Sequence, residues 1–167
     1  MSPGICWFCN TFRDGTRRTA SKVSLKEVLQ WSQSFEKLMG TKHGPFIYQS
    51  YLKTEYSDEN IEFWFACEKY KKIASQRKRF SVAQKLFKEY IKPDAPKQIN
   101  IDGPARQFIT ANLQEPTQSC FDEAQKIVYM HMERDSYPRF LGSEIYKNLV
   151  FSLSSRKEPL DSLKERQ

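Results

Sequence analysis

The chain has 167 residues, of which 28% are charged and 14% aromatic, enough for one globular domain with a substantial core. Its formal net charge is +7, but the bases are spread along the chain, and the densest run, residues 69–79, follows a predicted helix. We therefore do not expect nucleic acid as the partner; a basic nucleic-acid binder is the weaker alternative and would show a steeply salt-dependent affinity. No apolar run approaches a membrane span and the first residues lack a signal-peptide core, so we expect a cytoplasmic protein.

Residues 1–33 are predicted to form a basic N-terminal tail and a first helix. Cys6 and Cys9 flank Trp7 and Phe8 and are followed by arginines. Acylation of these thiols next to basic residues would supply the two signals that stable anchoring at an anionic membrane surface requires. A tail with incidental thiols is an equally good interpretation. A lone CxxC pair is a weak zinc signal, and we expect no metal and no cofactor.

The sequence from 24 to 72 predicts three helices. Ser24-Leu-Lys-Glu27 is a capping box, and apolar residues at helical spacing continue from it to Gly40. Gly44-Pro45 predicts the start of a short second helix. The third helix is the most apolar segment of the chain, with Ser57 as its expected N-cap. Because apolar residues from Ile61 to Cys67 cover most of its circumference, we expect neighbours to bury this central helix.

Further helices are predicted after the central one. A charged break at 76–79 precedes an amphipathic helix from Val82 to Ile91. Asp102 is the expected cap of the next helix, and Thr117 of a longer one that runs to about residue 133.

A final helix is predicted from Ser143 to Val150, and residues 151–167 are expected to form a polar C-terminal tail. The domain itself is expected to span 34–150. No segment alternates with a period of two for long enough to be a convincing strand. The predicted fold class is therefore all-α.

Short connections favour an antiparallel bundle for the four helices between 57 and 133. In such a bundle the segments 56–60, 97–102 and 135–139 lie at one end, and 76–79 lies at the other. The polar side chains of the three segments are Ser57, Glu59, Asn60, Asn100, Asp135, Ser136 and Arg139. Loops on a rigid bundle often carry function.

These side chains form hydrogen bonds and carry charge, but they include no nucleophile with a nearby base. The two histidines, His43 and His131, are not spaced for a catalytic or metal site. We therefore expect a docking surface and no catalytic centre. Local roles are an alternative for each residue alone: a cap for Ser57, a turn for Asn100, and an intrahelical ion pair for Asp135 with Arg139.

Long motifs within residues 34–150 resemble one known family. They are Glu55-Tyr-Ser-Asp-Glu-Asn-Ile-Glu-Phe-Trp64, Ile99-Asn-Ile-Asp102, Glu115-Pro-Thr117 with Cys120-Phe-Asp-Glu-Ala124, and Asp135-Ser-Tyr-Pro-Arg-Phe-Leu141. Together, in this order, they resemble the regulator of G-protein signalling (RGS) box, in a small single-domain member. The resemblance implies about nine helices: an antiparallel four-helix bundle plus a lobe formed by the N- and C-terminal helices.

The resemblance also implies a function. The chain would bind the GTP-bound α subunit of a heterotrimeric G protein, of the Gi or Gq class, and accelerate GTP hydrolysis as a monomer recruited to the inner face of the plasma membrane. Ser57, Glu59 and Asn60 would face the switch regions, and Asn100 the glutamine that orients the attacking water. The remaining three, Asp135, Ser136 and Arg139, would complete a pocket for a switch threonine.

Two positions depart from the family pattern: Asp58 replaces a more usual glutamate, and His131 stands where leucine is frequent. An adaptor that binds the active α subunit and blocks effectors without accelerating hydrolysis is the alternative function.

Overall fold

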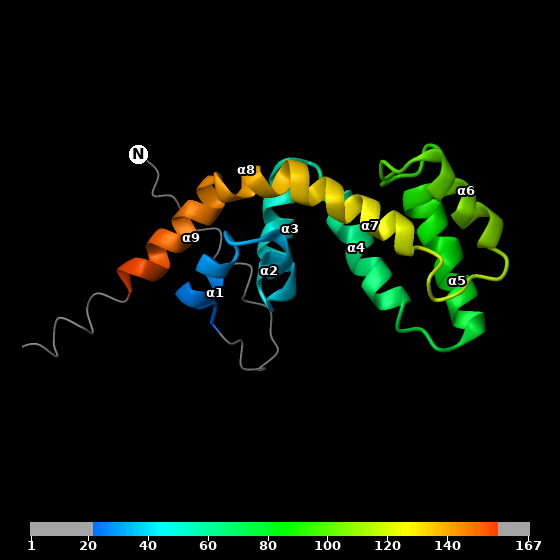
Figure 1. The fold of residues 1–167 in the computed structure, drawn as a ribbon, viewed down its shortest axis with the longest axis horizontal. Helices are drawn as coiled ribbons and strands as arrows, with labels where there is room; N and C mark the ends of the chain where they lie inside the picture. The colour runs from blue at the N-terminus through cyan, green and yellow to red at the C-terminus, as the bar shows by residue number, and fades with distance from the viewer. Residues whose placement is uncertain (1–21, 157–167) are drawn as a thin grey trace, which may run out of the picture.

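The computed structural model describes residues 22–156, and all regular structure in this range is helical, as predicted (Figure 1). The α-helices are α1 (Leu25–Gln30), α2 (Phe35–Gly40), α3 (Gly44–Thr54), α4 (Glu59–Tyr70), α5 (Gln76–Leu86), α6 (Gly103–Asn112), α7 (Asp122–His131), α8 (Tyr137–Leu141) and α9 (Glu144–Ser155). Two π-helical turns, η2 (Phe87–Ile91) and η3 (Met132–Ser136), continue α5 and join α7 to α8. Within the same residues, no helix is long and apolar enough to cross a membrane.

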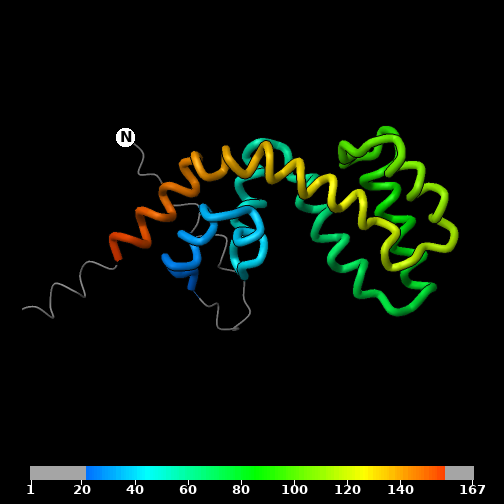
Figure 2. Tube along the Cα trace, viewed as in Figure 1, coloured from blue at the N-terminus to red at the C-terminus, as the bar shows by residue number. Residues whose placement is uncertain are grey.

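Helices α4, α5, α6 and α7 form the antiparallel four-helix bundle that the sequence predicts (Figures 1 and 2). Its core combines aliphatic and aromatic side chains with two thiols. The most enclosed members are Phe63, Cys67, Tyr70, Ala83, Ile91, Ile99, Ile109, Cys120, Phe121, Ala124 and Val128. Burial raises the pKa of the Cys120 thiol to about 11 and also raises the pKa of Cys67, so both are protonated core residues.

The remaining helices, α1, α2, α3, α8 and α9, build a second lobe from both ends of the described segment (Figure 1). The Tyr146 hydroxyl of α9 donates to the Val28 carbonyl oxygen (3.1 Å), 118 positions away. Similarly, the Tyr137 hydroxyl of α8 donates to the Trp31 carbonyl oxygen (2.7 Å). Contacts between residues far apart in sequence therefore hold this lobe together.

Two elements belong to both parts of the molecule. The succession α7, η3 and α8 runs along one long edge and joins the bundle to the lobe (Figures 1 and 2). In α4, Ile61 is part of the lobe core, whereas Phe63 is part of the bundle core, because residues two apart lie on nearly opposite sides of a helix. The central position predicted for α4 is confirmed. It is not enclosed on every side, however, since Trp64 and Phe65 are half-buried.

Residues 24–40 form two helices, not the single helix predicted. Ser34 caps α2 by accepting a hydrogen bond from the amide three residues later (3.1 Å), and the chain turns between the two helices. The predicted capping box is only half formed. Ser24 Oγ accepts from the Glu27 amide (3.1 Å), but the Glu27 carboxylate accepts from the His43 amide (3.1 Å) instead of returning to Ser24.

Three other boundaries also differ from the prediction. The predicted charged break at 76–79 is the first turn of α5, because Ser75 caps the helix there. Helix α7 begins at Asp122 and not at Thr117. The Thr117 carbonyl oxygen instead begins a turn, accepting from the Cys120 amide (3.3 Å), and it also accepts from the Tyr70 hydroxyl (2.6 Å). Helix α9 continues to Ser155. The expected Asp102 cap is confirmed, with Oδ1 accepting from an amide at 2.8 Å.

Candidate functional site

Ion pairs connect the segments 97–102 and 135–139 to residues that flank the segment 56–60. Arg139, in the middle of the short helix α8, contacts Glu55, the C-cap of α3 directly before the α3–α4 connection (Nη2–Oε2, 3.1 Å). Lys97, in the connection between η2 and α6, pairs with Glu62 in the first turn of α4. These connections all lie on the same long edge of the molecule in Figure 1. Segments 97–102 and 135–139 thus each lie close to one end of segment 56–60, in agreement with the juxtaposition predicted from helix parity. We call residues 55–60, 96–100 and 135–139 the docking edge.

Helix α3 ends in a Schellman motif that determines how the next residues are used. The Tyr56 amide donates to the Lys53 carbonyl oxygen (3.2 Å) and the Ser57 amide to the Leu52 carbonyl oxygen (3.0 Å), with Tyr56 in the left-handed region at φ 53°. The Ser57 side chain does not cap α4, because its Oγ accepts no hydrogen bond from the first turn; the N-cap of α4 is Asp58. The predicted capping role of Ser57 is therefore wrong.

The strained turn exposes one large side chain. Tyr56 is 95% exposed, and a left-handed conformation is unfavourable for any residue other than glycine. Strain of this kind is concentrated at functional sites, where the surrounding structure maintains it. Tyr56 and its neighbour Glu55 belong to the docking edge, although the sequence analysis did not select them as site residues. Both lie within the Glu55–Trp64 motif, so the motif could have pointed to them as site residues.

Unpaired polar atoms line the start of α4. Within the described residues, Ser57 Oγ and Asn60 Oδ1 are shielded from solvent and have no hydrogen-bond partner. Beside them, Asp58, Glu59 and Lys97 border a shallow cavity of about 250 Å³. An acceptor shielded without a partner is costly, so these atoms favour a ligand or protein that supplies donors.

Asn100 is exposed between two buried isoleucines. Ile99 and Ile101 point into the bundle core, and the Ile99 amide donates to the Tyr90 carbonyl oxygen of η2 (3.0 Å). The alternation turns the Asn100 side chain outward. A surface loop that is tied to a helix in this way can present an amide to a partner without first becoming ordered.

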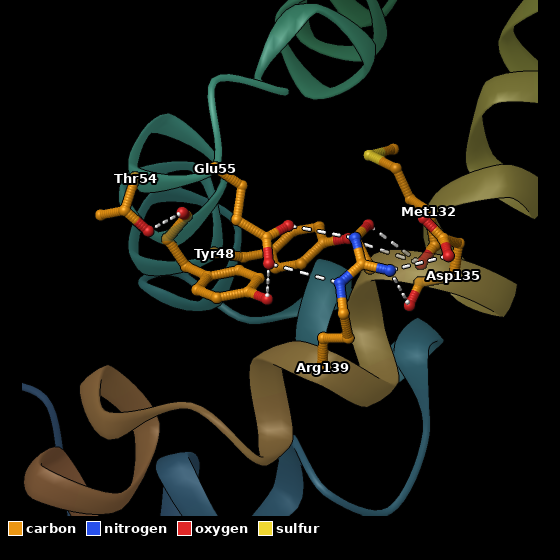
Figure 3. A network of polar contacts seen from close by, with 8 residues as sticks. Tyr48, Thr54, Glu55, Met132, Asp135 and Arg139 are labelled. Atoms are coloured by element: carbon orange, nitrogen blue, oxygen red, sulfur yellow. Dashed lines mark hydrogen bonds and ion pairs between the residues drawn. The ribbon is translucent and has the colours of Figure 1, made fainter.

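Arg139 is held between two carboxylates (Figure 3). Its Nη1 lies 2.7 Å from Asp135 Oδ1, which confirms the predicted ion pair, and its Nε and Nη2 lie 3.3 and 3.1 Å from the two oxygens of Glu55. The hydrogen bond from Arg139 holds the pKa of Glu55 below its usual value, and the two carboxylates raise the pKa of Arg139. The guanidinium therefore fixes both carboxylates in place, and its positive charge is largely balanced by them and not available to a binding partner.

Ser136 points into the protein. It is buried, and its hydroxyl is hydrogen-bonded to the Tyr48 hydroxyl of α3 and lies 3.3 Å from the Met132 carbonyl oxygen. Asp135 is exposed, so it faces solvent while Ser136 faces the core. Ser136 thus stabilises the docking edge from the inside in this structure. A direct contact between Ser136 and a partner stays a prediction.

Each of the two π-helical turns borders one part of the docking edge. η2 precedes the connection that carries Asn100, and η3 contains Asp135 and Ser136. A π-helical turn inserts one residue into a helix and changes the direction of the side chains beyond it; such turns are frequent at functional sites. No simple sequence signal marks them, so the sequence analysis missed both.

The described residues contain no group of histidine, cysteine, aspartate or glutamate side chains that could hold a metal ion. His131 is exposed on α7. Cys6 and Cys9, the acylation candidates, lie outside the described residues. The docking edge therefore offers carboxylates, amides and an exposed tyrosine for binding.

Comparisons with known proteins identify the family of this chain. The model of the regulator of G protein signaling domain matches residues 34–149. The chain belongs to the regulator of G-protein signalling family. It is 60% identical over 155 residues to Regulator of G-protein signaling 13 from Homo sapiens, covering 93% of this chain and 98% of that protein, and 58% identical over 156 residues to the Mus musculus protein of that name (93% and 99%). Regulator of G-protein signaling 1 from Equus caballus is 49% identical over 143 residues, with coverage of 84% and 72%.

Proposed function

We propose that this regulator binds the GTP-bound α subunit of a heterotrimeric G protein of the Gi or Gq class and accelerates its hydrolysis of GTP. The observation that carries the proposal is the docking edge: carboxylates and amides presented along one edge, with Glu55 and Asp135 held in place by the one arginine in it. Such a surface is suited to holding another protein in one conformation. The relatives' names, regulators of G-protein signaling, support this class of partner.

The physical mechanism follows from what phosphoryl transfer requires. An α subunit already carries its arginine finger and its water-orienting glutamine, so a partner accelerates hydrolysis by holding the switch segments in line. Binding the transition-state arrangement more tightly than the ground state lowers the barrier without a reacting group from the partner. In this scheme Ser57, Glu59 and Asn60 receive the switch regions, and Asn100 supports the glutamine.

Arg139 acts by orientation in this proposal. Its guanidinium has three of its nitrogens engaged with carboxylates on its own chain, so it is not a finger that reaches toward a phosphate. It instead fixes the direction of Asp135, which accepts hydrogen bonds from the switch segment together with its neighbour Ser136. We further expect the protein to act as a monomer and without a catalytic centre of its own.

Single-turnover GTP hydrolysis tests the proposal. The wild-type chain is expected to accelerate hydrolysis by a purified Gi- or Gq-class α subunit, and Asn60→Ala and Asn100→Ala are each expected to remove most of that acceleration. Asn148→Ala is the matched control, because Asn148 is an exposed asparagine on α9. Full acceleration by both site variants would refute the site assignment.

The alternative, an adaptor that only blocks effectors, gives a different result in the same experiment. It predicts binding to the α subunit loaded with GDP and aluminium fluoride, which imitates the transferring phosphoryl group, with no change in the hydrolysis rate. The exposed carboxylates of the docking edge would serve either function. The rate of GTP hydrolysis distinguishes the activator from the adaptor.

Recruitment to the inner face of the plasma membrane is the second part of the proposal. It depends on Cys6 and Cys9 and the neighbouring arginines, in the segment before residue 22. Metabolic labelling with a fatty-acid analogue should mark the wild-type chain and not the variant in which both residues are replaced by serine. Equal labelling of the two would exclude these thiols.

A further inference from the structure

Two tyrosines of α3 lie directly behind the docking edge. Tyr48 and Tyr51 are three positions apart on one face of the helix, and their rings stack with centroids 6.4 Å apart. Both are buried, and both rings pack against Phe140 of α8, at 5.4 and 5.5 Å. The rings alone would fill this space equally well as phenylalanines, so the hydroxyls need a separate explanation.

Each hydroxyl leads to a different part of the docking edge (Figure 3). The Tyr51 hydroxyl donates to Glu55 Oε1, and the same carboxylate holds Arg139, which in turn holds Asp135. The Tyr48 hydroxyl is bonded to the Ser136 hydroxyl and lies 3.5 Å from the Met132 carbonyl oxygen.

The two series of hydrogen bonds, one from each tyrosine hydroxyl, end at consecutive residues of η3. One restrains the Asp135 side chain from outside, through Arg139, and the other holds Ser136 from inside the lobe core. In η3 the Met132 carbonyl oxygen accepts from the Tyr137 amide, and the Ser136 and Tyr48 hydroxyls lie 3.3 and 3.5 Å from the same oxygen, so α3 is tied to this π-helical turn. The Tyr48 anchor keeps Ser136 in the core and thereby leaves Asp135 at the surface.

We propose that Tyr48 and Tyr51 are positioning residues for the docking edge, which preset Asp135 and Glu55 for the partner through their hydroxyl groups. This inference rests on the proposed function, because it assigns these two residues a share in the affinity for the α subunit. Preset groups lose less freedom on binding, so the hydroxyls contribute to affinity without touching the partner.

The variants Tyr48→Phe and Tyr51→Phe remove only the hydroxyls. Tyr146→Phe is the matched control: its ring also packs on Phe140 (5.4 Å) in the same core, but its hydroxyl donates to the Val28 carbonyl oxygen, away from the docking edge. With the α subunit loaded with GDP and aluminium fluoride, Tyr48→Phe and Tyr51→Phe should each weaken binding about tenfold, and Tyr146→Phe less than about twofold. Equal affinities for all three variants would overturn the inference.

A double-mutant cycle separates positioning from general stability. If Tyr51 acts through Glu55, then Tyr51→Phe should change affinity by less than about twofold when Glu55 is already alanine. The same holds for Tyr48→Phe combined with Ser136→Ala. Independent, multiplicative losses in both cycles would show that the hydroxyls only support the fold.

A partner-free measurement keeps this inference distinct from the proposed function. In the free full-length protein, Tyr51→Phe should shift the Arg139 Nε–H signal in the NMR spectrum and speed its exchange with water, whereas Tyr146→Phe should leave it unchanged. If the wild-type chain neither binds nor accelerates the α subunit, the proposed function fails while this signal still tests the positioning. An Arg139 signal that is the same in all variants refutes it.

Discussion

The bundle core and the lobe core differ in composition and in the range of their contacts. A quarter of the buried residues in the bundle core are aromatic, against half of those in the lobe core, where several aromatic side chains also donate hydrogen bonds. The bundle joins helices that follow one another, whereas the lobe joins α1 to α9 across most of the chain. The docking edge lies where the two parts meet, with α4 and the α7–η3–α8 succession shared between them.

This difference suggests a division of roles. The bundle supplies a rigid frame through apolar packing, which is nondirectional. The lobe core adds directional hydrogen bonds from tyrosine and tryptophan, and two of those tyrosines reach the docking edge. We therefore expect changes in the bundle core to affect stability alone, and changes in the lobe core to affect stability and binding together.

Deletion of residues 1–33 should have the largest effect and would show whether the lobe can form without α1. The deletion removes Val28 and Trp31, both completely buried, although the family match begins only at residue 34. Loss of these side chains should lower the free energy of unfolding by more than about 5 kcal/mol. Urea denaturation measures the free energy of unfolding of this deletion variant and of a reference chain that starts at residue 22. Equal stability of the two chains would mean that α1 is dispensable.

Phe121→Ala and Phe140→Ala compare the two cores directly. Both residues are almost completely buried among other aromatic rings, so each substitution should cost about 3–5 kcal/mol of stability. At a temperature where both variants are folded, only Phe140→Ala should also weaken binding to the α subunit, because its ring supports Tyr48 and Tyr51. Equal affinities would contradict the division of roles.

Helix caps provide a milder comparison. Asp102 caps α6 in the bundle and Ser143 caps α9 in the lobe, each by accepting an amide hydrogen bond. Replacing either by alanine should lower stability by about 1 kcal/mol, and thermal unfolding followed by circular dichroism measures the change. Ser32→Ala, an exposed serine between α1 and α2, is the control. A loss as large as that of a core substitution would mean that these residues do more than cap.

The smallest effect should be the pH dependence of Glu55→Gln. Hydrogen bonding to Arg139 lowers the pKa of Glu55 in the folded protein from its ordinary value of 4.5. The ion pair therefore stabilises the fold fully above pH 4.5, and this contribution is lost as the pH falls through the lower, folded-state pKa. Because Arg139 is 47% exposed, we expect less than about 1 kcal/mol.

Denaturation curves from pH 7 to 3 should show the wild type and Glu55→Gln converging at the acid end. Glu133→Gln, a change at an exposed carboxylate in η3, is the control. A constant difference between wild type and Glu55→Gln across this range would show that the charge of Glu55 is unimportant.

The sequence alone was sufficient for the fold class, the central helix, the Asp102 cap and the proximity of segments 97–102 and 135–139 to segment 56–60. Helical periodicity and the parity of antiparallel helices are local or topological properties, so they can be inferred without coordinates. The family resemblance, confirmed by the comparisons, came from motifs that are contiguous in sequence.

Only the tertiary structure decided how individual side chains are used. Ser57 completes the end of α3 instead of starting α4, Glu27 turns to His43, and Ser136 faces inward while Asp135 faces out. For Glu27 and Ser136 a local hydrogen-bonding option competes with a partner from another segment, and that partner is the one bonded in the folded protein. For Ser57 two local options compete, and the end of α3 takes the amide. Residue types and spacing cannot reveal that competition, since its outcome depends on which helices pack together.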